Sequence, residues 1–129
     1  MLKGFEVVNL TIGSPYISIT KNGVTFNKAS IVKLGKPACV KLLMNKSDKM
    51  IAVQSCNDLD ENATAFYKPK KSGLITVRWN NGELINTISR LMSWNLNEDG
   101  YRIDGDFLDE ENAMVFDLKK AKSISENED

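Results

Sequence analysis

Hydrophobic and polar residues alternate along short stretches of this chain, and a period of two predicts β-strands. The alternation runs through residues 5–12 and, more cleanly, through residues 16–20, which read YISIT. Residues 24–26 resume the pattern after Asn22-Gly23, a dipeptide that favours a hairpin because both residues tolerate a positive φ. We therefore expect a β-hairpin in the first part of the chain.

The spacing of apolar residues then changes to that of a helix. Apolar residues recur at helical spacing within residues 28–34, which predicts a short helix. Asn27 is a suitable N-cap for this helix, and Gly35 is suited to end it. Two further strands are expected over residues 39–44 and 50–56, around the polar turn NKSDK.

The second part of the chain repeats this order of elements. Residues 74–79 predict a strand, and Asn81-Gly82 repeats the hairpin signal. The elements expected after it are a returning strand over 83–85, an Asn86 cap, a helix over 87–94, and strands over 101–108 and 112–118.

Both parts read strand–strand–helix–strand–strand, which suggests an internal duplication that sets Asn22 on Asn81 and Asn27 on Asn86. One half is too small to bury its own apolar faces, whereas two halves can close a barrel without free edges. We expect a single mainly β (α+β) domain over residues 1–118. Its divisions would be half-repeats over about 16–56 and 74–118, a polar connector over 57–73, and a charged, flexible tail over 119–129.

Composition narrows the functional classes. The 129 residues contain no apolar run near the roughly 20 needed to span a bilayer, and the N-terminus lacks a signal-peptide pattern, so we expect a cytoplasmic protein. The chain has no histidine, and Cys39 and Cys56 have neither zinc-site nor CxxC spacing. No nucleophile has a base at a recognisable spacing, so we expect no enzyme, no metal site and no other cofactor.

Charge is unevenly distributed along the chain. Residues 1–71 hold 11 lysines and 5 acidic residues, a net charge of +6, whereas residues 72–129 carry −6. Seven of the lysines lie within residues 21–49 beside a single acidic residue. Such an asymmetry can mark one face for nucleic acid and another for a different partner. It is equally typical of two surfaces that attract each other across an oligomer contact, or of a charged surface without a partner.

The run NGVTFNKASIVKLG over residues 22–35, followed by VKLLMNKSDKMIAVQ over residues 40–54, resembles the AbrB/SpoVT/MazE class of swapped-hairpin DNA-binding domains. The positions that match the pattern of that class are Gly23, Val24, Phe26, Leu34, Gly35, Val40, Leu42, Ile51 and Val53. The resemblance implies a cradle-loop β-barrel, which in that class two chains usually build together. Here both halves would lie in one chain, as a pseudo-twofold pseudo-dimer.

The resemblance implies a small DNA-binding regulator of prokaryotic or phage type, as a monomer or homodimer. The basic residue that follows the turn glycine in that class is replaced here by Val24 and Glu83. We expect contacts with the phosphates of duplex DNA, more than readout of bases, from the remaining cations nearby. These cations are Lys21, Lys28, Lys33, Arg78 and Arg90.

A second hypothesis is a non-catalytic protein-interaction module, antitoxin-like or inhibitory, that does not bind DNA. The lost loop arginines and the acidic second half favour it, and the acidic half would face the protein partner. Residues 95–106 have part of the residue order of a calcium loop, but Arg102 and the closing Asp106 depart from it. Trp79 and Trp94 are interpreted as core residues in preference to stacking platforms for single-stranded nucleic acid.

Overall fold

The computed structural model describes residues 2–5 and 13–124, so the strand expected over residues 5–12 lies outside it apart from Phe5. The described chain forms nine strands, two α-helices and two short 3-10 helices. In chain order these are β1 (Tyr16–Thr20), β2 (Gly23–Phe26), α1 (Lys28–Lys33), β3 (Cys39–Asn45), β4 (Met50–Cys56), β5 (Thr64–Ala65), β6 (Val77–Trp79), α2 (Gly82–Met92), β7 (Tyr101–Leu108), η1 (Asp109–Glu111), β8 (Ala113–Asp117), η2 (Leu118–Lys120) and β9 (Lys122–Ser123).

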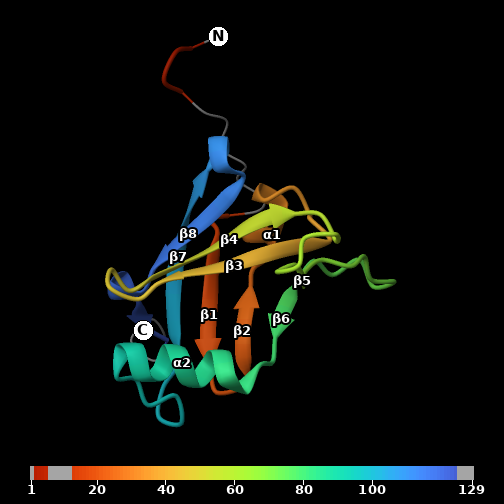
Figure 1. The fold of residues 1–129 in the computed structure, drawn as a ribbon. Coiled ribbons are helices and arrows are strands. Elements are labelled where there is room, and N and C mark those ends of the chain that lie inside the picture. The colour runs from red at the N-terminus through yellow and green to blue at the C-terminus, as the bar shows by residue number, and fades with distance from the viewer. Residues whose placement is uncertain (1, 6–12, 125–129) are drawn as a thin grey trace.

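The strands form one sheet in the order β5-β3-β4-β8-β7-β1-β2-β6, with β9 added to β7, and every pairing is antiparallel. The sheet curls into a half-barrel (Figure 1). Helix α2 crosses the end of the half-barrel where β1 turns into β2, and α1 lies toward the opposite end (Figure 1). The mainly β class expected from the alternating pattern is confirmed.

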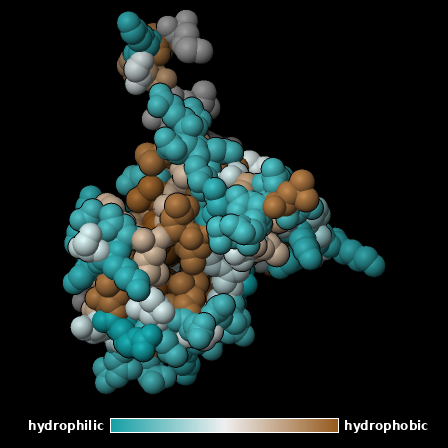
Figure 2. Space-filling view, viewed as in Figure 1, coloured by the Kyte–Doolittle hydropathy of each residue, from teal (hydrophilic) through white to brown (hydrophobic). Residues whose placement is uncertain are grey.

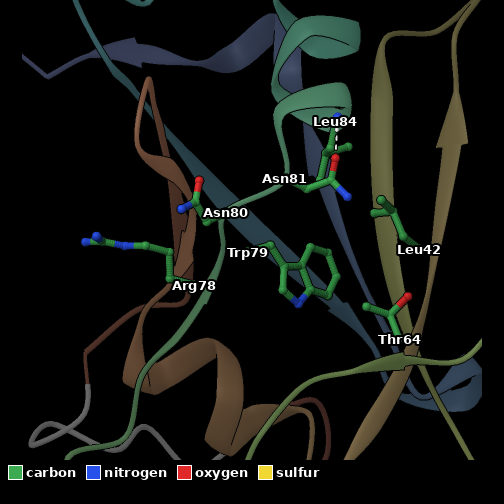
Figure 3. Close-up of a pocket in the computed structure, with 7 residues that line it drawn as sticks. All are labelled: Leu42, Thr64, Arg78, Trp79, Asn80, Asn81 and Leu84. Atoms are coloured by element: carbon green, nitrogen blue, oxygen red, sulfur yellow. Dashed lines mark hydrogen bonds between the residues drawn. The ribbon is translucent and has the colours of Figure 1, made fainter.

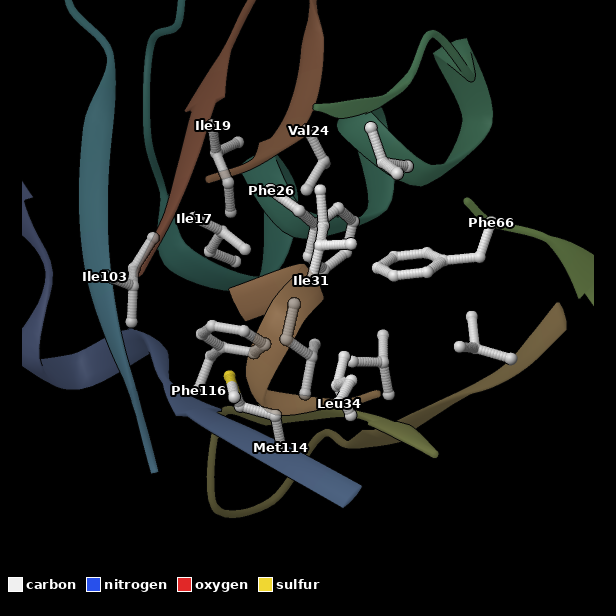
Figure 4. Close-up of a cluster of buried hydrophobic side chains, with 14 of the residues drawn as sticks. Ile17, Ile19, Val24, Phe26, Ile31, Leu34, Phe66, Ile103, Met114 and Phe116 are labelled. Carbon is white, nitrogen blue, oxygen red and sulfur yellow. The ribbon is translucent and has the colours of Figure 1, made fainter. Parts of the chain in front are cut away.

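Inward-facing residues of the strands fill the half-barrel together with residues from both helices (Figure 4). Phe26 lies among three other aromatic rings, at 5.0 Å from Phe66, 4.9 Å from Trp79 and 6.2 Å from Phe116, all edge to face. Such pairs stabilise a core beyond the area that they bury. Phe66 comes from residues 57–73, so the segment expected to be a polar connector contributes to the core.

The structure confirms the elements expected in the first half. The turn between β1 and β2 consists of residues 21 and 22, and Gly23 is the first residue of β2, with a φ of +143°. The side chain of Asn27 caps α1 by accepting a hydrogen bond from the backbone N–H of Ser30 at 3.0 Å. Gly35, with a φ of +90°, lies just beyond the C-cap, as expected.

The second half differs from the sequence expectation at its helix. The hairpin expected at Asn81-Gly82 and the strand over 83–85 are wrong, because α2 begins at Gly82 and includes these residues. Asn81, rather than Asn86, is the N-cap, and its Oδ1 accepts from the N–H of Leu84 at 3.0 Å. The apolar residues of α2 explain this outcome, because they continue the helical spacing upstream to residue 84. Those that pack against the core are Leu84, Ile85, Ile88, Leu91 and Met92.

The C-terminal hairpin is confirmed as β7 and β8, but the segment after it is structured further than the expected tail. Leu118 is buried in η2, and β9 pairs with β7 through Lys122 opposite Arg102. Ala121 packs against the core between them, so apolar contacts hold this segment in place. Residues 125–129 lie outside the described part of the chain.

The half-barrel is open on one side. Strand β5 pairs only with Cys39 and Val40 of β3, and in the described chain the rest of that edge of β3 has no partner strand. Figure 2 shows hydrophobic surface in the space between β3 and α2. Neither described helix is long and apolar enough to cross a membrane.

Candidate functional site

A straight row of polar side chains crosses the outer face of the strands β9, β7, β1, β2 and β6. Residues that are directly opposite one another on neighbouring strands point to the same face of a sheet. The pairing register places Lys122 opposite Arg102, Arg102 opposite Ser18, Ser18 opposite Thr25, and Thr25 opposite Arg78. These five residues are called the basic row below.

The basic row faces away from the core. Ile17 and Ile19 are fully buried on the inner face of β1, so Ser18 between them points outward. In the same way, Arg78 and Trp79 leave β6 on opposite sides, with the guanidinium of Arg78 directed away from the indole (Figure 3). Arg78 is accordingly exposed, whereas Trp79 packs against the core.

Neighbouring side chains hold the two arginines in place. Arg78 Nε donates a hydrogen bond to Thr25 Oγ1 at 3.2 Å, which leaves the terminal N–H groups of the guanidinium directed outward. The guanidinium of Arg102 lies 3.6 Å from the ring centre of Tyr16, a cation–π contact. Both guanidinium groups are therefore positioned before any ligand binds, which reduces the entropy lost on binding.

The charge of the row is not neutralised within the protein. In the described part of the chain, no carboxylate lies within ion-pair distance of Arg78, Arg102 or Lys122. The acidic residues on the outer face of β7 are Asp104, opposite Tyr16 at the start of β1, and Asp106, opposite Val115 of β8. Three strand spacings separate Arg102 from Arg78, or about 14 Å between backbones, which is on the order of the major-groove width of B-DNA.

The structure separates the five cations expected to contact DNA. Arg78 belongs to the basic row. Lys21 lies in the β1–β2 turn and Arg90 in the last turn of α2, at the same end of the half-barrel (Figure 1). Lys28 and Lys33 begin and end α1, toward the other end.

Of the five residues of the row, only Arg78 was expected from the sequence, and the two missed cations are Arg102 and Lys122. Arg102 precedes Ile103, an apolar residue of a clear alternation, so the outward direction of the Arg102 side chain could be predicted from the sequence. Its place in one row with Arg78 could not be predicted, because it depends on the pairing of β7 with β1, some 85 residues earlier in the chain, and on the pairings of β1 with β2 and β2 with β6. Lys122 lies in the segment expected to be a tail.

A hollow of about 300 Å³ lies at the open side of the half-barrel, lined by Leu42, Thr64, Trp79, Leu84 and their neighbours (Figure 3). The indole of Trp79 faces Leu42 and Thr64 across it (Figure 3), and its Nε1 donates to the carbonyl oxygen of Ala65 at 3.2 Å. Among the described residues that border this hollow, Arg78 is the one that is charged, and its guanidinium points away. Leu42, Trp79 and Leu84 give this hollow an apolar wall.

The described residues hold no group of three or more histidine, cysteine or acidic side chains placed to bind a metal ion. The chemistry that remains is that of a fixed cationic surface with hydroxyl groups between the charges. The electrostatic potential of such a surface suits anionic ligands. Comparison of the chain with models of known protein families, with curated proteins and with solved structures found no match.

Proposed function

We propose that this protein binds duplex DNA through its phosphates, as a small regulator, and that the basic row is the contact surface. The observation that carries this proposal is the row itself, with three cations and two hydroxyl side chains in register across five strands. Guanidinium groups bind phosphate oxygens through paired N–H donors, and the hydroxyls of Ser18 and Thr25 add donors between them.

The proposed mode of binding is electrostatic and depends little on base sequence. Contacts with phosphates position a protein on DNA, whereas contacts with base edges specify the sequence. The row offers arginine, lysine and hydroxyl side chains on a sheet face, and no helix projects from it. We therefore expect affinity to fall steeply with salt and to differ little between duplexes.

A double variant tests this proposal. Arg78→Gln with Arg102→Gln removes two charges from the row, and Lys46→Gln with Lys49→Gln removes two charges from the exposed β3–β4 turn. Duplex binding is measured between about 50 and 200 mM salt, and loss of two phosphate contacts reduces the slope of log K against log salt by about 2. Failure of the wild type to bind any duplex at low salt refutes the proposal, as does an equal loss in both variants.

Protein binding is the second candidate, supported by the outer face of the other half of the sheet. Leu43, Ala52 and Val115 form a row that ends at Asp106 of β7, and Leu43 is 45% exposed. The acidic 3-10 helix Asp109–Glu111 lies at the end of the same hairpin. A partner captured by the wild type but not by Leu43→Ser, in the absence of nucleic acid, favours this candidate over DNA binding.

We also propose that the chain is an AbrB-like pseudo-dimer whose halves are related by a pseudo-twofold axis. The pairings β2·β6 and β4·β8 each join strands that would be equivalent, and Ala52 lies directly opposite Val115. The hairpins β3–β4 and β7–β8 correspond at a constant offset of 63 residues, which sets the buried Val40 on the buried Ile103. At the helices the correspondence sets Asn27 on Asn81, since both are N-caps.

Two further features fit this symmetry. Strand β5 pairs with β3 as β1 pairs with β7, so the connector supplies a short counterpart of the first strand. The longer α2 and the loop after it account for the change of offset between helix and hairpin. The test is superposition of β2–α1–β3–β4 on β6–α2–β7–β8 in a crystal structure, and a rotation far from 180° overturns the proposal.

A further inference from the structure

We infer that a second hollow, between α2 and the β1–β2 turn, binds a nucleoside phosphate. The hollow measures about 390 Å³, within the range of small-ligand sites. Three segments line it, namely the turn, one face of α2 and the loop after α2. The lining side chains that carry the inference are Lys21, Asn86, Ser89, Trp94, Asn95 and Asn97.

One wall of the hollow is a fixed aromatic ring. Trp94 stacks on Tyr101 with ring centres 4.0 Å apart and planes 11° from parallel. Its backbone N–H donates to the carbonyl oxygen of Ser89 at 2.9 Å, and Ser93 before it adopts the left-handed conformation that ends α2. A ring held in this way is a platform for a flat base, because little side-chain freedom remains to be lost.

The other walls carry neutral amides and one cation. Asn95 Oδ1 accepts from the N–H of Asn97 at 3.0 Å, so the amide nitrogen of Asn95 remains to donate to a ligand. Asn86 is exposed on α2 and offers both an amide donor and an amide acceptor. Side-chain amides of this kind pair with the edges of bases, adenine above all.

Lys21 adds the charge that a phosphate requires. The described residues that line the hollow include this cation and no carboxylate, so none of them repels an anionic ligand. A flat ring with polar edges and an attached phosphate matches the indole, the three amides and the ammonium group together. An uncharged sugar or a fatty acid would match only part of this set.

The ligand is either a free nucleotide or one nucleotide of a bound strand. Lys21 belongs to the turn that joins β1 to β2, and the outward residues Ser18 and Thr25 of these strands lie in the basic row. Lys21 lies three residues beyond Ser18, or about 10 Å along the strand direction, so a nucleic-acid strand that extends from the row in this direction would reach the hollow. Binding of a strand rests on the proposed function, whereas binding of a free nucleotide does not.

Calorimetric titration of the full chain with AMP, adenosine and ribose 5-phosphate tests the inference. We expect AMP to bind most tightly, and Lys21→Gln to weaken AMP by about tenfold while adenosine is unaffected. Asn86→Ala, which favours the helix, weakens both AMP and adenosine. Lys70→Gln, a loss of the same charge from an exposed loop, leaves AMP binding unchanged.

The outcomes separate this inference from the proposed function. No binding of AMP up to about 10 mM by the folded wild type overturns the inference, as does equal weakening by Lys21→Gln and Lys70→Gln. If AMP binds but no duplex does, the proposed function fails and the nucleotide site stands. Arg78→Gln with Arg102→Gln lowers duplex binding and leaves AMP binding intact. If AMP displaces a bound single-stranded oligonucleotide from the protein, a nucleic-acid strand is identified as the source of the nucleotide.

Discussion

The carboxamide of Asn27 joins the start of β1 to the start of α1, because its Oδ1 accepts hydrogen bonds from the backbone N–H of Tyr16 and of Ser30, each at 3.0 Å. The hydroxyl of Ser30 donates to the same oxygen at 2.7 Å, and Asn27 Nδ2 donates to the carbonyl of Ser14 at 2.9 Å. Ser30 is fully buried. One side chain thus fixes a helix start, a strand start and a buried hydroxyl.

Replacement of Asn27 by alanine is therefore expected to cost more stability than replacement of the other helix cap. In the described part of the chain, the side chain of Asn81 accepts one hydrogen bond, from the N–H of Leu84. Loss of an ordinary cap costs about 1 kcal/mol, and the groups left unpaired near Asn27 raise that cost to about 3 kcal/mol. Urea unfolding of Asn27→Ala and Asn81→Ala measures the difference, and equal midpoints would contradict it.

The two caps also show how far the sequence determines the fold. Asn27 was identified because a strand pattern ends immediately before it and a helix pattern begins after it. In the second half, Asn81-Gly82 carries a hairpin signal and a cap signal at once, and the hairpin signal is the stronger of the two locally. The apolar spacing from Leu84 onward decides for the helix, because burial of a helix face outweighs the preference of one dipeptide.

The candidate site was less predictable than the fold. The outward direction of a side chain follows from alternation within a strand. The outward-facing Arg78 was therefore predicted as a contact residue, and Arg102 could have been predicted in the same way. Adjacency across the sheet depends on which strands pair, and β9, β7, β1, β2 and β6 come from distant parts of the chain. The nucleotide hollow depends on how α2 packs against the β1–β2 turn, which no short pattern reveals.

Gly23 is expected to tolerate no side chain. Its φ of +143° is rarely adopted by other residues, and an added Cβ would lie 2.7 Å from the carbonyl oxygen of Trp79. This oxygen belongs to the backbone, so relief of the clash would require a shift of the main chain. Gly23→Ala should cost about 2 kcal/mol or more and loosen the β2·β6 pairing. Gly82→Ala is the matched control. Open space surrounds Gly82 in the first turn of α2, so alanine there should add a few tenths of a kcal/mol.

The thiol of Cys56 is expected to react slowly with alkylating reagents at pH 8. Burial raises the pKa of Cys56 above its ordinary value, and the nearby Asp60 carboxylate raises this pKa further, whereas Lys41 lowers it. Asp60→Asn removes a negative charge and releases Lys41 from its 3.5 Å ion pair with Asp60. Both effects lower the pKa of Cys56, so the thiolate fraction at pH 8 and the alkylation rate increase.

Alkylation by iodoacetamide between pH 7 and 10 in a Cys39→Ser background measures this change, since Cys39 lies opposite Cys56 in the β3·β4 pair. Asp58→Asn removes an exposed charge that is not among the groups shifting the pKa of Cys56, and it serves as the control. An alkylation profile that moves to higher pH in Asp60→Asn would contradict the assignment of Asp60 as a group that raises this pKa.

Cleavage of the connector is expected to leave the two halves associated. Residues 68–73 are exposed, so a specific protease site inserted after Lys70 should be cut without unfolding the sheet. Three ladders join the halves, namely β2·β6, β4·β8 and β1·β7, and the side chains of both halves share one core.

The cut fragments should elute together in gel filtration and keep the circular dichroism spectrum of the uncut insertion variant. Their unfolding midpoint should rise with protein concentration, because unfolding now releases two chains. Fragments that separate under native conditions would show that each half folds by itself, and would remove the physical reason for two halves in one chain.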